Sequence, residues 1–275
     1  MTLAESVLAQ YEKNKAAASG NRVSQEERMK KYFTTVLPKG TSTAEKRIRI
    51  LPTKDGSSPF VEVFFHEMQV DGKWVKLFDP EQEGKRSPLN EIRQQLLLTG
   101  IDTDKELAKT YRSRKFYIVK LIDRDNEQDG VKFWRFKDAY KGDGVLDKLV
   151  PIIRKYGEIA DPETGRDLTI TLALAKSNNG KDYTFVSSVL PDDKSKLHED
   201  PAISAEWVND ELVWSDVYFK KGEDYLDMVA SGDTPKWDNN LSKWIRSNEA
   251  TGEATIGSKV EDPQAQDEPD EELPF

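Results

Sequence analysis

The sequence contains no cysteine and only two histidines, His66 and His198. The missing thiols exclude disulfides, thiolate metal sites and cysteine nucleophiles, and they fit a reducing compartment. No apolar run approaches the roughly 18 residues that a membrane-spanning helix needs. The N-terminus also lacks the continuous apolar segment of a signal peptide. These absences indicate a polar chain that uses charged and aromatic side chains rather than thiol chemistry.

The distribution of charge is more informative than its sum. The 275 residues allow one large domain or two small ones, and 36% hydrophobic content is enough for a core. A net charge of −9 and a pI near 5.0 superficially disfavour nucleic acid as a partner. Residues 109–155, however, hold 13 Lys and Arg against 7 Asp and Glu. A basic segment inside an acidic chain marks a candidate site for a polyanion.

The central segment, residues 109–141, combines this positive charge with aromatic rings. Two β-type runs, residues 114–122 and 131–137, are joined by an acidic turn that ends at Gly130. Cations that neutralise phosphates and rings that stack on unpaired bases are what a single-stranded nucleic acid needs. Alternate residues of a strand point inward, so about half of the rings should be core. We expect one face to carry Tyr117, Val119 and Leu121, and the other to carry Phe116, Ile118 and Lys120.

Further short strands and marginal helices surround this segment. Alternation predicts strands over residues 47–51, 60–68, 73–78, 168–176 and 183–190, with an Asp71-Gly72 hairpin turn. Helical spacing predicts helices over residues 2–18, 24–31, 89–98, 103–108 and 145–156. Hairpin-joined strands with helices at their margins predict an α+β, mainly β fold. The expected architecture is a small Greek-key β-barrel core with helical insertions and flanking helices.

The ends of the chain differ from the core in composition. We expect residues 1–31 to form a helical arm, either frayed or used for docking and self-association. Residues 32–245 form the core, and its acidic end, residues 193–245, is expected to add short helices packed on the barrel. Residues 246–260 are rich in small residues and predict a flexible linker. Residues 261–275 hold seven acidic and no basic residues, which predicts disorder.

The acidic tail ends in an apolar tip, Leu273-Pro274-Phe275. Bacterial-type single-stranded DNA-binding proteins end in a similar acidic stretch with a Pro-Phe tip that partner enzymes bind. The alternative is a tail that only adds solubility. The tail can also compete with DNA for the basic segment, most strongly at low salt. The residues expected to bind partners are Asp270, Glu271, Glu272, Leu273, Pro274 and Phe275.

An ordered set of short motifs resembles the single-stranded DNA-binding (helix-destabilising) protein of T-even-type phages. The resemblance covers about residues 40–190. Each motif is short, and their order carries the resemblance. In chain order the matching segments are Ile48-Arg49-Ile50-Leu51-Pro52-Thr53-Lys54, His66 with Gly72-Lys73-Trp74, Arg112 with Phe116-Tyr117 and Asp125, Phe133-Trp134-Arg135-Phe136, and Leu146-Asp147-Lys148-Leu149. The resemblance implies an OB-fold core, sequence-tolerant binding of single strands, and a role in phage replication, recombination and repair in the cytoplasm of an infected bacterium.

The sequence departs from that family in two places. The family binds structural zinc through one His and three Cys, whereas here Asp79, Ser87 and Asn90 stand at the cysteine positions beside His66. Ser and Asn are poor zinc ligands, so we expect no zinc and no other cofactor. Packing of the helix over residues 89–98 is expected to offset the lost metal. The basic N-terminal motif is also missing, which puts cooperative binding along the strand in question.

Together these patterns predict a DNA-binding protein without catalytic activity. No Ser/His/Asp order or nucleotide-binding fingerprint is present, although a metal-dependent nuclease acting on single strands remains an alternative, as does a replication adaptor with incidental DNA binding. The residues expected to contact phosphates are Arg47, Arg49, Lys54, Arg112, Arg114, Lys115, Lys120, Arg135, Lys137 and Lys141. The rings expected to stack on bases are Tyr111, Phe116, Trp134 and Tyr140, and Phe136 is either a further base contact or core.

Overall fold

The computed structural model describes residues 29–139, 142–177, 180, 182–218, 220–238 and 241–247. The expected helix over residues 2–18, nearly all of the linker and the whole acidic tail lie outside these residues. Tyr140 and Lys141 also lie outside them.

The described strands and helices follow the predicted ones closely. The helices are α3 (Pro88–Leu98), α4 (Asp102–Thr110), α5 (Val145–Tyr156), α6 (Pro201–Val208), α7 (Trp214–Val217) and α8 (Glu223–Ala230), with short 3-10 turns η1 (Pro80–Glu83) and η2 (Glu127–Asp129). The strands are β1 (Thr43–Ile50), β2 (Val61–Val70), β3 (Lys73–Phe78), β4 (Ser113–Asp123), β5 (Val131–Lys137), β6 (Arg166–Lys176), β7 (Asp182–Lys194), β8 (Pro235–Asp238) and β9 (Lys243–Arg246). The predicted bounds of β3, β5 and α5 are confirmed to the residue.

Strand β4 is the central strand of the sheet and pairs with three other strands. Seven of the described strands form one antiparallel sheet in the order β3-β2-β4-β1-β6-β7, and β5 pairs with the other edge of β4. The first half of β4 pairs with β2, as in His66 with Ser113, and its last residues pair with β1, as in Ile50 with Leu121. The α+β, mainly β prediction is confirmed, and the sheet is consistent with an OB-like fold. The described strands do not close into a barrel, so that part of the prediction is wrong.

The turn between β2 and β3 is the predicted hairpin. Asp71 and Gly72 both have positive φ, 53° and 78°. Two successive positive φ values are typical of a type I′ turn, whose twist matches that of the flanking strands. This turn sets the β2–β3 register, with Val70 opposite Lys73.

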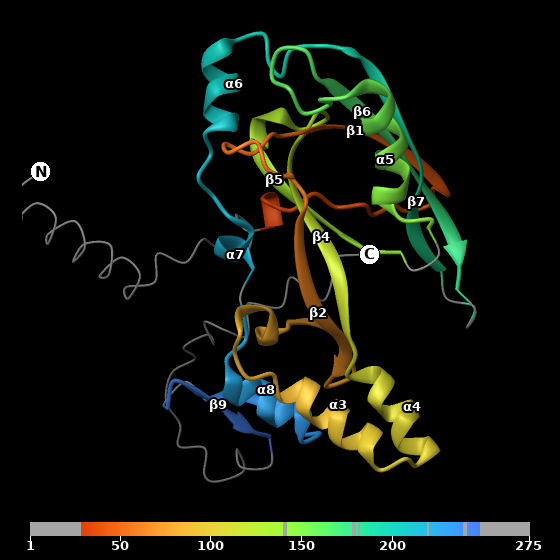
Figure 1. The fold of residues 1–275 in the computed structure, drawn as a ribbon, viewed down its shortest axis with the longest axis vertical. Helices are drawn as coiled ribbons and strands as arrows, with labels where there is room; N and C mark the ends of the chain where they lie inside the picture. The colour runs from red at the N-terminus through yellow and green to blue at the C-terminus, as the bar shows by residue number, and fades with distance from the viewer. Residues whose placement is uncertain are drawn as a thin grey trace, which may run out of the picture.

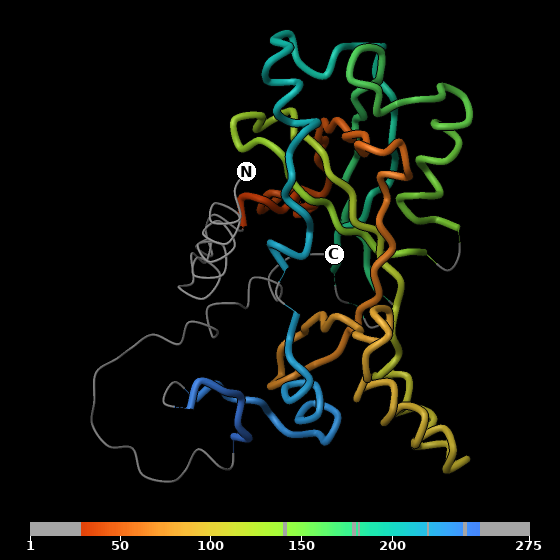
Figure 2. The backbone as a smooth tube through the Cα atoms, turned by 60° about the vertical axis from the view of Figure 1, so that its left-hand side comes forward, coloured from red at the N-terminus to blue at the C-terminus, as the bar shows by residue number. Residues whose placement is uncertain are grey.

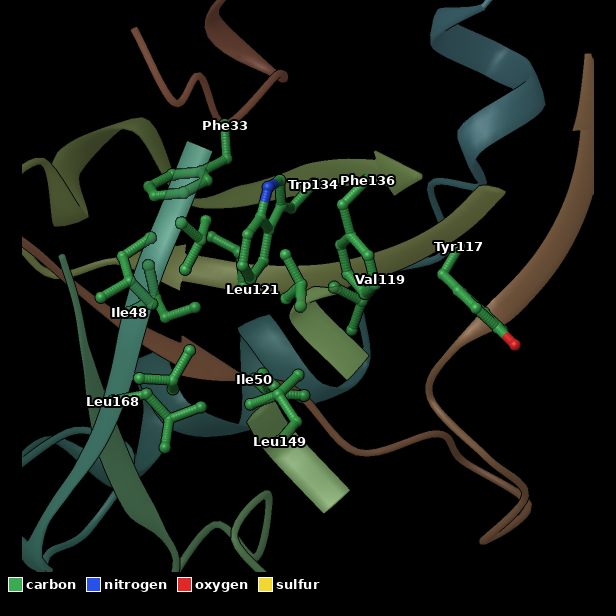
Figure 3. Close-up of a cluster of buried hydrophobic side chains, with 14 of the residues drawn as sticks. Phe33, Ile48, Ile50, Tyr117, Val119, Leu121, Trp134, Phe136, Leu149 and Leu168 are labelled. Atoms are coloured by element: carbon green, nitrogen blue, oxygen red, sulfur yellow. The ribbon is translucent and has the colours of Figure 1, made fainter. Parts of the chain in front are cut away.

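Both faces of β4 are buried. Tyr117, Val119 and Leu121 face the largest core, beneath α5, and Figure 3 shows most of the labelled side chains of this core converging. Phe116 and Ile118 face a second core instead. The predicted division of β4 into two faces is confirmed. The second face is nevertheless largely covered, because the chain after α6 crosses it.

The molecule is elongated, with β2 and β4 running between its two ends (Figures 1 and 2). Helices α3, α4 and α8 gather at one end, and α6 lies at the other. The prediction of short helices after residue 193 is confirmed by α6, α7 and α8. Helix α8, however, packs on α3 and the β2–β3 hairpin. The β8–β9 hairpin was not predicted. No helix in the described part of the chain is long and apolar enough to cross a membrane.

Candidate nucleic-acid interface

Strand alternation gathers five cations on one face of the sheet. Residues directly opposite each other in an antiparallel pair share a face. Lys137 lies opposite Phe116, Arg135 opposite Ile118, and Lys120 opposite Phe133. The same face continues across β2 and β3, with Arg114 opposite Phe65 and Lys76 opposite Glu67. We call this surface the basic face and define it by Lys76, Arg114, Lys120, Arg135 and Lys137.

One end of the basic face concentrates three cations around a single carboxylate. Glu67 forms an ion pair with Lys137, its Oε2 lies 3.5 Å from Nε of Arg114, and its Oε1 lies 3.9 Å from Nζ of Lys76. The Arg114 and Lys137 side chains are 44% and 43% exposed, whereas that of Lys76 is 3% exposed. The single carboxylate of Glu67 cannot neutralise both Arg114 and Lys137. The excess positive charge therefore faces solvent at Arg114 and Lys137.

Buried rings of the second core support these cations from below. The amino groups of Lys76 and Lys137 lie 5.9 and 5.8 Å from the centre of the Phe116 ring. The guanidinium of Arg135 lies 5.2 Å from the centre of the Phe65 ring. Cation–π contacts of this kind hold a charged side chain over an aromatic face. Phe116 thus positions cations and offers no surface to a base.

The rings predicted to stack on bases are mostly core, which corrects that prediction. Trp134 is 1% exposed and packs edge-on against Phe33, with ring centres 5.6 Å apart (Figure 3). Tyr111, Phe116 and Phe136 are at most 9% exposed. A base cannot stack on a ring whose faces are covered by protein. Tyr140, the remaining candidate, lies outside the described residues.

Arg49 was predicted to contact phosphate but is fully buried. Its Nη1 lies 3.2 Å from Oδ1 of Asp167, and its Nη2 donates to the carbonyl oxygens of Asp161 and Ser195 at 2.8 and 2.9 Å. Burial lowers the pKa of Arg49, and Asp167 opposes that shift. We therefore correct its role: Arg49 ties β1 to the chain before β6 and after β7.

Three other cations that were predicted to contact phosphate have different surroundings. Arg47 is half-exposed and pairs with Asp167 and Asp192, both at 3.2 Å. Lys115 lies on the opposite face of β4, where contacts with Tyr117 and Asp138 raise its pKa. Arg112 is exposed just before β4. These three are solvent-accessible but do not belong to the basic face.

A cavity of about 410 Å³ adjoins the other end of the basic face. This volume falls within the range of ligand clefts, about 300–1,000 Å³. Its walls are mainly apolar, and two ion pairs, Lys54 with Glu211 and Lys120 with Asp210, also line it. The lining residues are Leu51, Pro52, Thr53, Lys54, Pro59, Val61, Ile118, Lys120, Phe133, Trp207, Val208, Asp210, Glu211, Val213 and Trp214.

Residues 210–218, which we call the strap, cross the middle of the basic face. Trp214 lies 6.3 Å from Phe65, and Tyr218 lies 5.1 Å from the same ring, measured between ring centres. The hydroxyl of Tyr218 donates to the carbonyl oxygen of Lys76. The strap covers the apolar centre of the face, so charge remains accessible at its two ends.

Sequence reasoning missed two residues on this face. Trp74 is 56% exposed and lies opposite Gln69, on the same face as Lys76 two residues later. Continuing the alternation of β2 across the hairpin into β3 would have placed Trp74 and Lys76 beside Arg114. The strap could not have been found in this way, because its contacts come from a segment about 100 positions further along the chain.

No group of three or more His, Asp and Glu side chains among the described residues is arranged to hold a metal ion. A search of curated proteins gives no match to the chain. Comparison with protein families does give one: residues 42–225 match the family described as gp32 DNA binding protein like. The matched range includes every strand of the large sheet and both ends of the basic face.

Proposed function

Because the chain belongs to the gp32-like DNA-binding protein family, we propose that it binds single-stranded DNA without sequence preference. In this role it coats and protects single strands during phage DNA replication, recombination and repair in the cytoplasm of an infected bacterium. The proposal requires no chemical step. The observation that carries it is the basic face, which five cations from β3, β4 and β5 form on one side of the sheet.

Phosphates would bind at the two ends of this face. Arg114 and Lys137 are half-exposed beside Glu67, and Lys54 is 51% exposed beside the cavity. A strand crossing from one end to the other would release counterions at each contact, so its affinity should fall steeply with salt. Arg47 and Arg112 are further exposed cations that an extended strand could reach.

Bases would bind at the cavity and at Trp74. The cavity offers apolar walls beside the Lys54–Glu211 and Lys120–Asp210 ion pairs, and such walls suit an unstacked base. Trp74 offers an exposed ring on the same side of the sheet as Lys76. Stacking on such surfaces tolerates any base, because every base has a π-face.

The acidic tail is proposed to recruit replication, recombination or repair proteins through residues 270–275. Its acidic charge also suits competition with DNA for the basic face. Self-association along DNA through residues 1–31 is a further proposal. Residues 1–28 and 270–275 lie outside the described residues, so these roles are supported by the sequence alone.

The test is a titration of fluorescent poly-dT at several salt concentrations with the full chain and with a chain ending at Lys259. We expect tight, strongly salt-dependent binding that becomes tighter without the tail. Absence of binding by both chains would overturn the proposal. Weak, salt-insensitive binding would favour the adaptor alternative, and cleavage of the strand in magnesium would favour the nuclease alternative.

A further inference from the structure

A buried polar cluster joins β2, α3 and the start of β4. Asp79 follows β3 and is 4% exposed, and His66 of β2 is fully buried. Nδ2 of Asn90 lies 3.1 and 3.3 Å from the two carboxylate oxygens of Asp79. Ser87, which precedes α3, is 6% exposed. The positions where the T-even-type family carries its zinc ligands thus converge here, although three of them have lost their cysteines.

His66 keeps the orientation of a metal ligand. Its Nδ1 lies 2.8 Å from the carbonyl oxygen of Tyr111. A carbonyl only accepts, so Nδ1 carries the hydrogen. Histidines that bind metals commonly donate their other ring N–H to a carbonyl in this way. Nε2 is buried and faces Oδ1 of Asp79 at 3.5 Å, so a proton on Nε2 would point at that carboxylate.

The remaining side chains do not fit a zinc ion. Structural zinc takes four ligands, typically thiolates and imidazoles, and here Ser87 and Asn90 replace two of them. The Asp79 carboxylate is already engaged, because it accepts hydrogen bonds from Asn90 and from the backbone N–H of Glu81. Only His66 retains the chemistry of a zinc ligand, and its Nε2 faces the Asp79 carboxylate.

We propose that the Asp79 carboxylate replaces the metal ion as the charged centre of this cluster, so that this end of the protein folds without metal. The polarity of the site is inverted: a zinc centre is a cation among electron donors, whereas Asp79 is an anion among hydrogen-bond donors. The hydroxyls of Ser87 and Ser113 are buried and have no other partner among the described residues. They are therefore available to the carboxylate.

The electrostatics of Asp79 agree with this arrangement. Burial by itself would raise the pKa of the Asp79 carboxyl, but contacts from His66, Ser113 and Ser87 hold it well below its ordinary value. Asp79 is therefore ionised at neutral pH. The cluster fixes β2 at His66 and the start of β4 at Ser113, each one residue from a member of the Glu67–Arg114 ion pair. It thereby positions one end of the basic face.

The first test measures metal content and thermal stability of the full chain. We expect mass spectrometry to find no bound zinc in protein purified without chelator. We also expect EDTA or added zinc to change the melting temperature by less than about 1 °C. One zinc per chain, lost to EDTA together with a fall of about 5 °C or more, would overturn the inference.

The second test removes the charge of Asp79. Asp79→Asn should lower the melting temperature by about 5–10 °C and speed amide hydrogen exchange in α3. Asp102→Asn, at a 97% exposed position on α4, is the matched control and should change neither. Asn90→Ala, a milder change, should lower the melting temperature by a few degrees in case Asp79→Asn does not fold. A melting temperature unchanged within 1 °C in both cluster variants would contradict the inference.

The third test restores the thiolates. A chain with Asp79→Cys, Ser87→Cys and Asn90→Cys should bind one zinc ion with His66, and its melting temperature should rise on adding zinc. A folded triple variant that binds no zinc would show that Asp79 does not stand in a metal's place. Poly-dT binding by the unaltered chain is measured in parallel. If that chain does not bind poly-dT, the result contradicts the proposed function and leaves this inference intact.

Discussion

The amino group of Lys120 donates to both the backbone carbonyl and the carboxylate of Asp210, at 2.8 and 2.9 Å. This contact fastens the strap to the sheet and places one carboxylate against the basic face. The two side chains are 26% and 27% exposed, so solvent and ions only partly screen the pair. Asp210 therefore both holds the strap and offsets one of the cations of the basic face.

Changing the two partners of this contact should have opposite effects on DNA binding. Asp210→Asn removes the charge but keeps an oxygen acceptor for Lys120, so poly-dT affinity should rise about 2–5-fold at low salt. Lys120→Met should lower affinity and reduce the salt slope by about 1. Fluorescence titrations at several salt concentrations measure both. Glu206→Gln, at an exposed position on α6, is the control. If both variants shifted affinity in the same direction, the contact would act through folding rather than charge.

Arg114 and Lys137 should each contribute one phosphate contact. Arg114→Ala and Lys137→Ala should each reduce the salt slope of poly-dT binding by about 1. The free energy of unfolding should stay within about 0.5 kcal/mol of the unaltered chain, because both side chains are half-exposed. Lys105→Ala on α4 removes an equally exposed cation away from the basic face and should leave the slope unchanged. Equal effects of all three changes would mean that binding responds only to net charge.

Trp74 should contribute to DNA binding, whereas Trp134 should contribute to folding stability. Trp74→Ala should weaken poly-dT binding by about 1–3 kcal/mol with little change in stability, because its ring is exposed. Trp134→Ala should cost about 3–5 kcal/mol of folding free energy, because its ring fills the core. Denaturant unfolding and DNA titration on both variants separate the two roles. A large stability loss in Trp74→Ala would place that ring in a packed site instead.

The Asp167 carboxylate should stabilise the folded state more than the Asp192 carboxylate, with which it shares the partner Arg47. It accepts from the buried guanidinium of Arg49 and from Arg124, whose side chain is 8% exposed. Asp167→Asn leaves these charges with a weaker partner and should cost about 3–5 kcal/mol. Asp192→Asn breaks a half-exposed pair with Arg47 but keeps an oxygen acceptor for Thr169, and it should cost less than about 1 kcal/mol. Urea denaturation measures both, and equal losses would contradict the buried network.

Acid should weaken the cluster around Asp79 in a predictable window. The folded-state pKa of Asp79 lies below its ordinary value, because the opposing effect of burial is outweighed by contacts from His66, Ser113 and Ser87. Its contribution is therefore present above the ordinary pKa, about 3.9, and is lost as the pH falls below about 4. Asp79→Asn should show a shallower loss of unfolding free energy between pH 5 and pH 3. Identical pH profiles for the two chains would contradict this assignment.

Local sequence patterns predicted the elements well because each pattern reflects one physical requirement. Alternation marked the strands, the Asp71-Gly72 pair marked a hairpin turn, and apolar residues at helical spacing marked α5, although Val145, Leu149 and Ile152 are the residues that the structure buries. The β8–β9 hairpin was missed because four-residue strands are too short to display alternation.

The site was harder to predict because burial depends on distant segments. Alternation assigns Phe116 and Tyr117 to opposite faces of β4 but cannot say whether a face is covered. Tyr218, about 100 positions away, covers the face that carries Phe116. Arg49 alternates with core residues in the same manner as an exposed cation would. Its partners Asp161, Asp167 and Ser195, all more than 100 positions later, stabilise the buried charge.

The cluster around Asp79 contains no sulfur, and the chain has no cysteine anywhere. Peroxide, nitric oxide donors and cadmium inactivate thiolate-held zinc centres by attacking or capturing the sulfur. A fold centred on a carboxylate offers these agents no such target. If the proposed coating role and the metal-free cluster both hold, single strands would stay covered in a cell under oxidative attack or starved of zinc, when a zinc-dependent relative would lose its fold.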